Sequence, residues 1–310
     1  MNLLQAQQDR PVRIINFAGM DWYVRSGTGN PANNLWSDSE KSVWVDNQNR
    51  LHLKIRKVGN RWYAAEIRSV HPTTYGQHRF YVANRVDLLD RNIVAAVFIY
   101  KDNKHEMDIE FSRWKQKQAP NTQYVVQPEL PENLYKFDLK LQGNFSTHII
   151  NWQKKQIEFE SYFGHKIALP QAQYLINQWT YQQKSLTDDK QYRIHINLWM
   201  VDNQPPVNNQ EAELIIASMD SPVSPISISG KATPLISLYP NHYYDHIFVY
   251  IHQTSADIKY KLLQNNKILE QEDIQTDYFF IDLVNKSIGK YDLQIQINKQ
   301  VFRYEITKNY

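Results

Sequence analysis

The sequence contains no cysteine, and it contains no apolar run close to the length of a membrane-spanning helix. The absence of cysteine excludes structural disulfides, thiolate catalysis and cysteine-based zinc sites. A membrane span needs roughly 20 consecutive apolar residues, so we do not expect a membrane protein. Residues 1–17 have no basic segment followed by an apolar one, so we expect no signal peptide within this chain. We expect a secreted or cell-surface protein if such a segment has been removed, and an intracellular protein if there was none.

Strong charge of one sign is also missing. The formal net charge is only +3, and the lysines and arginines are scattered rather than clustered, so nucleic acid is not an expected partner. His148, His165 and His195 lie in strand-like runs without the spacing of metal ligands. We therefore expect neither a metal site nor a cofactor.

Aromatic residues are abundant, with 20 Tyr, 12 Phe and 8 Trp. Such residues favour strands, and they also suit flat, hydroxyl-rich ligands such as sugars. An aromatic β-core explains most of them.

Short alternating runs recur along the chain, and no convincing amphipathic helix of three turns or more is present. These runs include LHLKI (51–55), HRFYVANRV (78–86), VAAVFIY (94–100), FSTHIINW (145–152) and YRIHINLW (192–199). Period-two alternation in short segments is typical of an all-β sandwich. The fold class expected is therefore all-β.

A length of 310 residues accommodates one large β domain and a small second one. The segment DSPVSPISISGKAT (220–233) is rich in proline and serine, which is typical of a linker. We expect a large domain over 1–224, a linker over 225–233 and a small β-sandwich over 234–310. Alternation resumes after the linker, with a hairpin signal at NKQ (298–300).

The most informative stretch is HEMDIEF, residues 105–111, where three acids occupy every second position. Residues two apart in a strand share a face, so Glu106, Asp108 and Glu110 should point the same way. Met107 and Ile109 should point into the core. One face of this strand is therefore expected to be buried and the other acidic.

Three interpretations of the acidic face compete. It is a solvated strand surface, a calcium site, or the catalytic centre of a glycoside hydrolase. A regular strand supplies calcium ligands poorly, since such sites need varied angles and carbonyl oxygens. In a retaining glycosidase the two carboxyls lie roughly 5 Å apart, whereas the Cα atoms of Glu106 and Glu110 are about 13 Å apart along a strand. The catalytic interpretation therefore requires a curved, concave sheet.

The motif resembles the active-site strand of glycoside hydrolase family 16, which reads Glu-x-Asp-x-Glu with an apolar residue at each x. The likeness to the lichenase-like members extends over roughly residues 12–222. It includes EIRS (66–69), TYG (74–76), AAVFIY (95–100) and INLWMVDN (196–203), in the order and at about the spacing of that family. The resemblance implies a concanavalin-like β-jelly-roll sandwich.

By this resemblance, Glu106 matches the nucleophile, Asp108 the assisting acid and Glu110 the general acid/base. No extra residue separates Asp108 from Glu110, which is the unbulged form of lichenases and xyloglucan-active enzymes and favours β-1,4-containing glucans. The expected substrate-binding residues come from the motif match, from strand parity with the acids and from the segment before them: Trp199, Tyr100, Asn33, Gln127, Lys104 and His105.

The chain departs from the lichenase pattern at Lys104, where that pattern has a tryptophan. An ammonium group in place of an indole favours an anionic substrate or one with hydroxyls that accept from lysine. We expect a monomeric, retaining, endo-acting β-glycanase or transglycosylase that acts on a polysaccharide. The alternatives are a non-catalytic carbohydrate-binding protein on the same fold and a structural or adhesive β protein.

Overall fold

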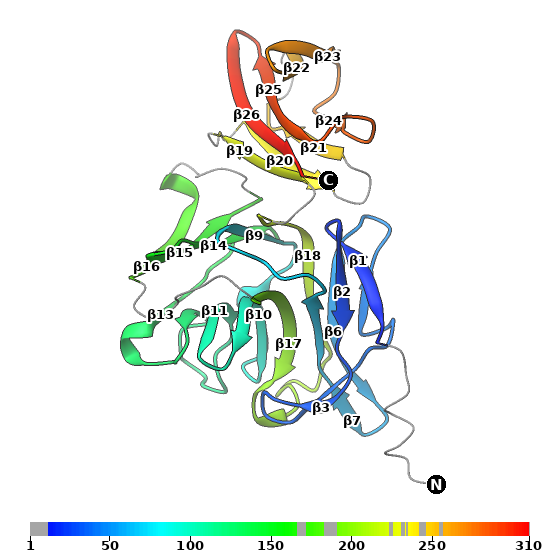
Figure 1. The fold of residues 1–310 in the computed structure, drawn as a ribbon. Helices are drawn as coiled ribbons and strands as arrows, with labels where there is room; N and C mark the ends of the chain where they lie inside the picture. The colour runs from blue at the N-terminus through cyan, green and yellow to red at the C-terminus, as the bar shows by residue number, and fades with distance from the viewer. Residues whose placement is uncertain are drawn as a thin grey trace.

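A computed structural model describes residues 12–165, 172–182, 191–222, 226–230, 233, 235–241, 246–253 and 257–309. Strands dominate these residues (Figure 1). The helical segments described are short 3₁₀ turns: Val86–Leu88, Pro131–Asn133, Ala172–Tyr174 and Val201–Asn203. None of the helices in the described part of the chain is long and apolar enough to cross a membrane.

Two eight-stranded antiparallel sheets form the larger body. Sheet I has the order β1 (Ile14–Phe17), β2 (Met20–Val24), β8 (Ala65–Ser69), β17 (Arg193–Met200), β10 (Ile93–Asp102), β11 (His105–Phe111), β12 (Thr122–Val126), β13 (Leu134–Phe137). Sheet II has the order β16 (Leu175–Gln182), β15 (Gln156–Phe163), β14 (Ser146–Trp152), β9 (Gly76–Val82), β18 (Ala212–Asp220), β6 (Leu51–Val58), β5 (Val43–Val45), with β7 (Arg61–Tyr63) paired to β6. A small hairpin joins β3 (Gly27–Gly29) to β4 (Asn34–Trp36).

The two sheets pack face to face through the apolar positions of the alternating runs. The Tyr124 ring stacks on Phe159 at 5.2 Å, and its hydroxyl donates to Oγ of Ser161 at 2.8 Å. Phe111 meets His148 edge-on, with 4.7 Å between ring centroids. Neighbouring strands in each sheet are often distant in sequence, as in the crossover from β8 to β17. The all-β jelly-roll sandwich expected from the sequence is confirmed.

The strands from β19 onward form a second body with its own core, drawn yellow to red in Figure 1. Sheet III has the order β19 (Ile226–Gly230), β26 (Gln300–Lys308), β25 (Gly289–Ile297), β22 (Ile258–Gln264), β23 (Lys267–Ile274). Sheet IV has the order β20 (Ile236–Asn241), β21 (His246–Ile251), β24 (Tyr278–Asp282). Buried side chains alternate along β21, β22, β24 and β25, and the expected small β-sandwich is present.

The segment expected as a linker, 225–233, is partly a strand. Residues 226–230 form β19, which pairs with β26 from Ile226–Lys308 to Gly230–Tyr304. Ile226 and Ile228 are buried in the second core. In this sequence serine alternates with isoleucine, which is the pattern of a half-buried strand, so a composition typical of linkers also fits β19.

The two bodies meet at buried polar and aromatic contacts. Tyr81 of β9 is fully buried and belongs to the core of the second body. Arg79 donates to the carbonyl oxygen of Ile228 at 3.0 Å and pairs with Asp220 at 3.5 Å, and both of these charged side chains are buried. Strand β9 of the larger body is therefore covered in part by β19.

A chain ending at residue 224 is expected to stay folded but to be less stable than the full chain. Sheets I and II retain their own core, whereas Tyr81 loses its cover. Exposing one large buried side chain costs about 2 kcal/mol. Thermal unfolding of the two chains by circular dichroism measures the difference. An unfolded shorter chain would show that residues 1–224 are not an independent domain.

Candidate active site

Strand β11 presents its three acids on one face, as alternation requires. Met107, Ile109 and Phe111 are fully buried in the core. Glu106, Asp108 and Glu110 lie on the opposite face. The pairing of β11 with β12 continues without a shift from Met107–Val126 to Phe111–Thr122. The strand is therefore regular and has no bulge between the second and third acid.

Adjacent strands surround these acids with rings and amides. On β10, Tyr100 lies opposite Glu106, and Ala96 lies opposite Glu110. On β12, the side-chain amide of Gln123 donates to a carboxylate oxygen of Glu110 at 2.5 Å. The small side chain of Ala96 leaves room beside Glu110.

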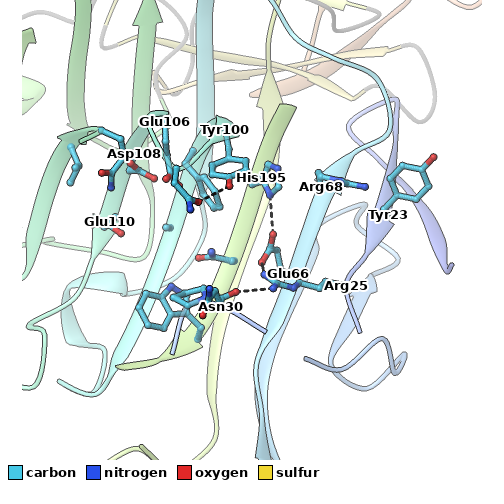
Figure 2. Close-up of a pocket in the computed structure, with 18 of the residues that line it drawn as sticks. Tyr23, Arg25, Asn30, Glu66, Arg68, Tyr100, Glu106, Asp108, Glu110 and His195 are labelled. Carbon is cyan, nitrogen blue, oxygen red and sulfur yellow. Dashed lines mark hydrogen bonds and ion pairs between the residues drawn. The ribbon is translucent and has the colours of Figure 1, made fainter. Parts of the chain in front are cut away.

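These side chains line a cavity of ≈ 890 Å³ over the face of sheet I (Figure 2). Ligand sites commonly measure about 300–1,000 Å³, so this volume is large enough for several sugar rings. The lining residues are Val12, Tyr23, Val24, Arg25, Ser26, Asn30, Pro31, Glu66, Arg68, Ala96, Phe98, Tyr100, Asn103, Glu106, Asp108, Glu110, Trp114, Val125, Gln127, Glu129, His195, Asn197 and Trp199.

Three of the expected substrate-binding residues line this cavity. Tyr100 and Gln127 lie at the end near Glu106, where the backbone N–H of Gln127 donates to the carbonyl oxygen of Glu106 at 3.0 Å. Trp199 is 6% exposed and packs edge-on against Trp114 at 5.7 Å. Two tryptophans therefore line the cavity at the Glu110 end of the acid row.

The other three do not line the cavity. Asn33 is exposed in a turn at φ 52°, while its neighbour Asn34 is buried and holds the backbone of Met200 through two hydrogen bonds. Lys104 is exposed in the turn between β10 and β11. His105, the first residue of β11, bonds to Asp102 at 2.7 Å across this turn. The hairpin ends beside the cavity, so the expected contacts of Lys104 and His105 with substrate are not supported by their positions.

Burial dominates the electrostatics of the three acids. It raises the pKa of Glu106 to about 7 and that of Glu110 to about 8, and it raises the pKa of Asp108 well above its usual range. Hydrogen bonding to Asp108 opposes the shift at Glu106, whereas the negative charge of Glu66 adds to it. The negative charges of Glu106 and Glu110 raise the pKa of Asp108 further. Because three like charges in one cavity repel, at least one acid keeps its proton near neutral pH.

Sequence reasoning missed a second charged group in the cavity, formed by Arg25, Glu66 and His195. Glu66 joins the other two, at 2.6 Å from Arg25 and 2.9 Å from His195 (Figure 2). The alternation of AEIRS (65–69) and of YRIHINLW (192–199) was the available signal, since it places Glu66 with Arg68 and His195 with Trp199 on one face. Only the strand order of sheet I brings these faces beside the acids.

Among the described residues, no cluster of three or more His, Asp or Glu side chains is arranged to hold a metal ion. The polar side chains that line the cavity supply carboxyls, amides, an imidazole and guanidinium groups.

Comparisons with known proteins find similarity in fold. No protein-family model matches the chain, and no curated protein matches it in sequence. Among solved structures, a Bacillus licheniformis β-glucanase matches with 19% identity, 64% of this chain and 90% of that one covered, and a TM-score of 0.46. A Bacteroides ovatus family 16 endo-glucanase matches with 14% identity, 64% and 93% covered, and a TM-score of 0.46.

A Mycobacterium tuberculosis protein described as an immunostimulatory antigen and pseudo β-1,3-glucanase matches with 14% identity, 64% and 89% covered, and a TM-score of 0.47. The chain is thus similar to glucanases and to a protein described as a pseudo-glucanase. Sheets I and II of this chain form the jelly-roll sandwich that the resemblance to glycoside hydrolase family 16 implies.

Proposed function

We propose that the chain is a retaining endo-β-glycanase that hydrolyses, or transglycosylates, a β-linked polysaccharide. The observation that supports this most is the row of three acids on one face of an unbulged strand, with Asp108 buried between Glu106 and Glu110, within a cavity large enough for sugar rings. A pure carbohydrate-binding protein gains nothing from holding three mutually repelling carboxyls together in one cavity, because their repulsion and their partial removal from water cost free energy.

In this proposal Glu106 attacks the anomeric carbon while Glu110 protonates the leaving glycosidic oxygen. The covalent glycosyl-enzyme is then hydrolysed by a water that Glu110 deprotonates, or it is transferred to an acceptor hydroxyl. Asp108 keeps its proton because of burial, and its hydrogen bond lowers the pKa of Glu106. The middle acid therefore favours the ionised form of the nucleophile.

The substrate partner in this proposal is a polysaccharide or oligosaccharide. An extended substrate suits a cavity that runs across several strands of sheet I. A polymeric substrate of this kind is met at the cell surface or outside the cell, and the enzyme is proposed to act there as a monomer.

The proposal is tested by incubating the protein with a panel of β-linked polysaccharides. Reducing ends and product sizes are measured, followed by proton NMR of the first-formed anomer. Endo-cleavage with retention of configuration supports the proposal. Products of inverted configuration would contradict the retaining mechanism, and an absence of turnover across the panel would favour the non-catalytic alternative.

We expect the pH dependence of kcat/KM to be bell-shaped with a maximum between about pH 7 and 8. Glu106 must be ionised to attack, and burial raises its pKa to about 7, so activity should fall as pH drops below that value. Glu110 must be protonated to donate, and burial raises its pKa to about 8, so activity should fall above it. Initial rates at subsaturating substrate across this range give both limbs.

Glu129→Gln provides a matched variant for this profile. The charge of Glu129 contributes to the raised pKa of Glu110, so its removal should shift the basic limb to lower pH and leave the acid limb nearly in place. A maximum near the ordinary carboxyl pKa of about 4 would show that burial does not control these groups.

A further inference from the structure

The carboxylate of Glu66 is fully engaged within the protein. Oε2 accepts from Arg25 at 2.6 Å, and Oε1 accepts from Nδ1 of His195 at 2.9 Å. Burial disfavours ionisation of Glu66, but the hydrogen bond from His195 and the charge of Arg25 oppose this effect, and its pKa is lowered. Glu66 is therefore an acceptor whose two oxygens are both in use.

Arg25 is itself held in place from three sides. Besides Glu66, it donates to the carbonyl oxygen of Asn30 at 2.7 Å, and its guanidinium lies 4.1 Å from the centre of the Trp36 ring. A guanidinium carries its charge throughout the physiological range. The Arg25–Glu66 pair is therefore a fixed support for His195.

This support determines which nitrogen of His195 carries the proton. An ionised carboxylate can only accept, so Nδ1 must donate to Glu66. Burial lowers the pKa of His195, and the ring is neutral near pH 7. A neutral imidazole with its proton on Nδ1 has a lone pair on Nε2. Nε2 makes no hydrogen bond to any residue that the structure describes.

His195 lines the cavity at the middle of sheet I. It pairs across the sheet with Phe98 on β10 and with Arg68 on β8. Phe98 in turn lies opposite Asp108, so His195 is two strand spacings, about 10 Å, from the middle acid. The Tyr100 ring and the imidazole form a T-shaped pair, with 5.5 Å between centroids. His195 is thus beside the acids without touching them.

We propose that His195 is a specificity-determining residue whose Nε2 accepts a hydrogen bond from a hydroxyl of the bound glycan, at a sugar other than the one being attacked. Glu66 and Arg25 are positioning residues that hold the histidine in the tautomer that this contact needs. The inference rests on the proposed glycanase function and names a hydroxyl donor on the substrate as the recognised group.

Two substitutions separate the two nitrogens of the imidazole. His195→Asn places an amide near the Nδ1 position, where it can still donate to Glu66, and leaves nothing at the Nε2 position. His195→Gln places an amide oxygen near the Nε2 position. We expect KM to rise about fivefold to tenfold in His195→Asn with kcat nearly unchanged, the effect of one lost neutral hydrogen bond outside the reacting bond. His195→Gln should retain most of the affinity.

The tautomer is measured independently of activity by ¹H–¹⁵N NMR of the full chain labelled on histidine. The His195 signals are identified by their loss in His195→Gln. We expect the Nδ1–H form in the wild type, and a shift toward the Nε2–H form in Glu66→Gln, since an amide can donate to Nδ1. The KM of Glu66→Gln should rise together with that shift.

The outcomes separate this inference from the proposed function. A wild-type protein that neither binds nor cleaves any glycan of the panel overturns the proposed function and with it the ligand of His195. With wild-type turnover established, an Nε2–H tautomer, or an unchanged KM in His195→Asn, overturns the inference and leaves the proposed function standing.

Discussion

Glu106→Gln is expected to lower the rate of hydrolysis by at least about 1,000-fold. Catalytic residues that act together depend on one another, so the loss of the nucleophile alone has an effect of this size or larger. The amide keeps the shape of the side chain and its place opposite Tyr100, but it cannot attack the anomeric carbon. Oligosaccharide binding and the thermal midpoint should change little. Single-turnover kinetics and isothermal calorimetry measure the two properties separately.

Glu129→Gln is the matched control for this substitution. Glu129 lines the same cavity but is exposed, and it undergoes the same chemical change. It should keep most of its turnover. If Glu106→Gln retains more than about a tenth of wild-type turnover, Glu106 is not the nucleophile. A reduction of that size is no larger than the effect of one missing hydrogen bond.

Glu110→Ala is expected to lose hydrolysis of natural substrates to a similar degree and to recover with azide on substrates that have a good leaving group. Such substrates form the glycosyl-enzyme without protonation, and azide attacks that intermediate without a general base. Two displacements at the anomeric carbon give a glycosyl azide of retained configuration. Azide-dependent rates and NMR of the product check both points.

The same test on Glu106→Ala gives the opposite stereochemistry. There azide takes the place of the missing carboxylate and attacks the substrate once, so the glycosyl azide should be inverted. The pair of variants assigns the two roles from product configuration alone. Retained products from both variants, or rescue of neither, would contradict the double-displacement mechanism.

Much of the architecture follows from local patterns in the chain. Alternation of apolar and polar residues over short segments predicted an all-β fold. Met107 and Ile109 are buried in the core on the face of β11 that points away from the acids, as expected. The small second sandwich was also predicted. The predicted linker over 225–233 was wrong where β19 forms, because serine alternating with isoleucine satisfies a strand as well as a loop.

The expected binding residues show which positions a local sequence pattern can place in the cavity and which it cannot. Tyr100 was placed on the acid face by parity with its own strand, and it lines the cavity. Lys104 and His105 are close to Glu106 in sequence, but Lys104 is in the hairpin turn and His105 begins β11 on the face opposite that of Glu106, and neither lines the cavity. Closeness along the chain does not set the direction of a side chain, which depends on the turn for Lys104 and on strand parity for His105.

The sequence by itself determined which side chains share a face, because parity within a strand depends only on the two-residue repeat of an extended backbone. It determined the acid row and the apolar positions behind it. Only the tertiary structure decided which strands lie side by side. The order β2-β8-β17-β10-β11 sets Arg25, Glu66 and His195 beside acids far away in the chain. It also decided the protonation of those acids, since desolvation depends on everything packed around a carboxyl.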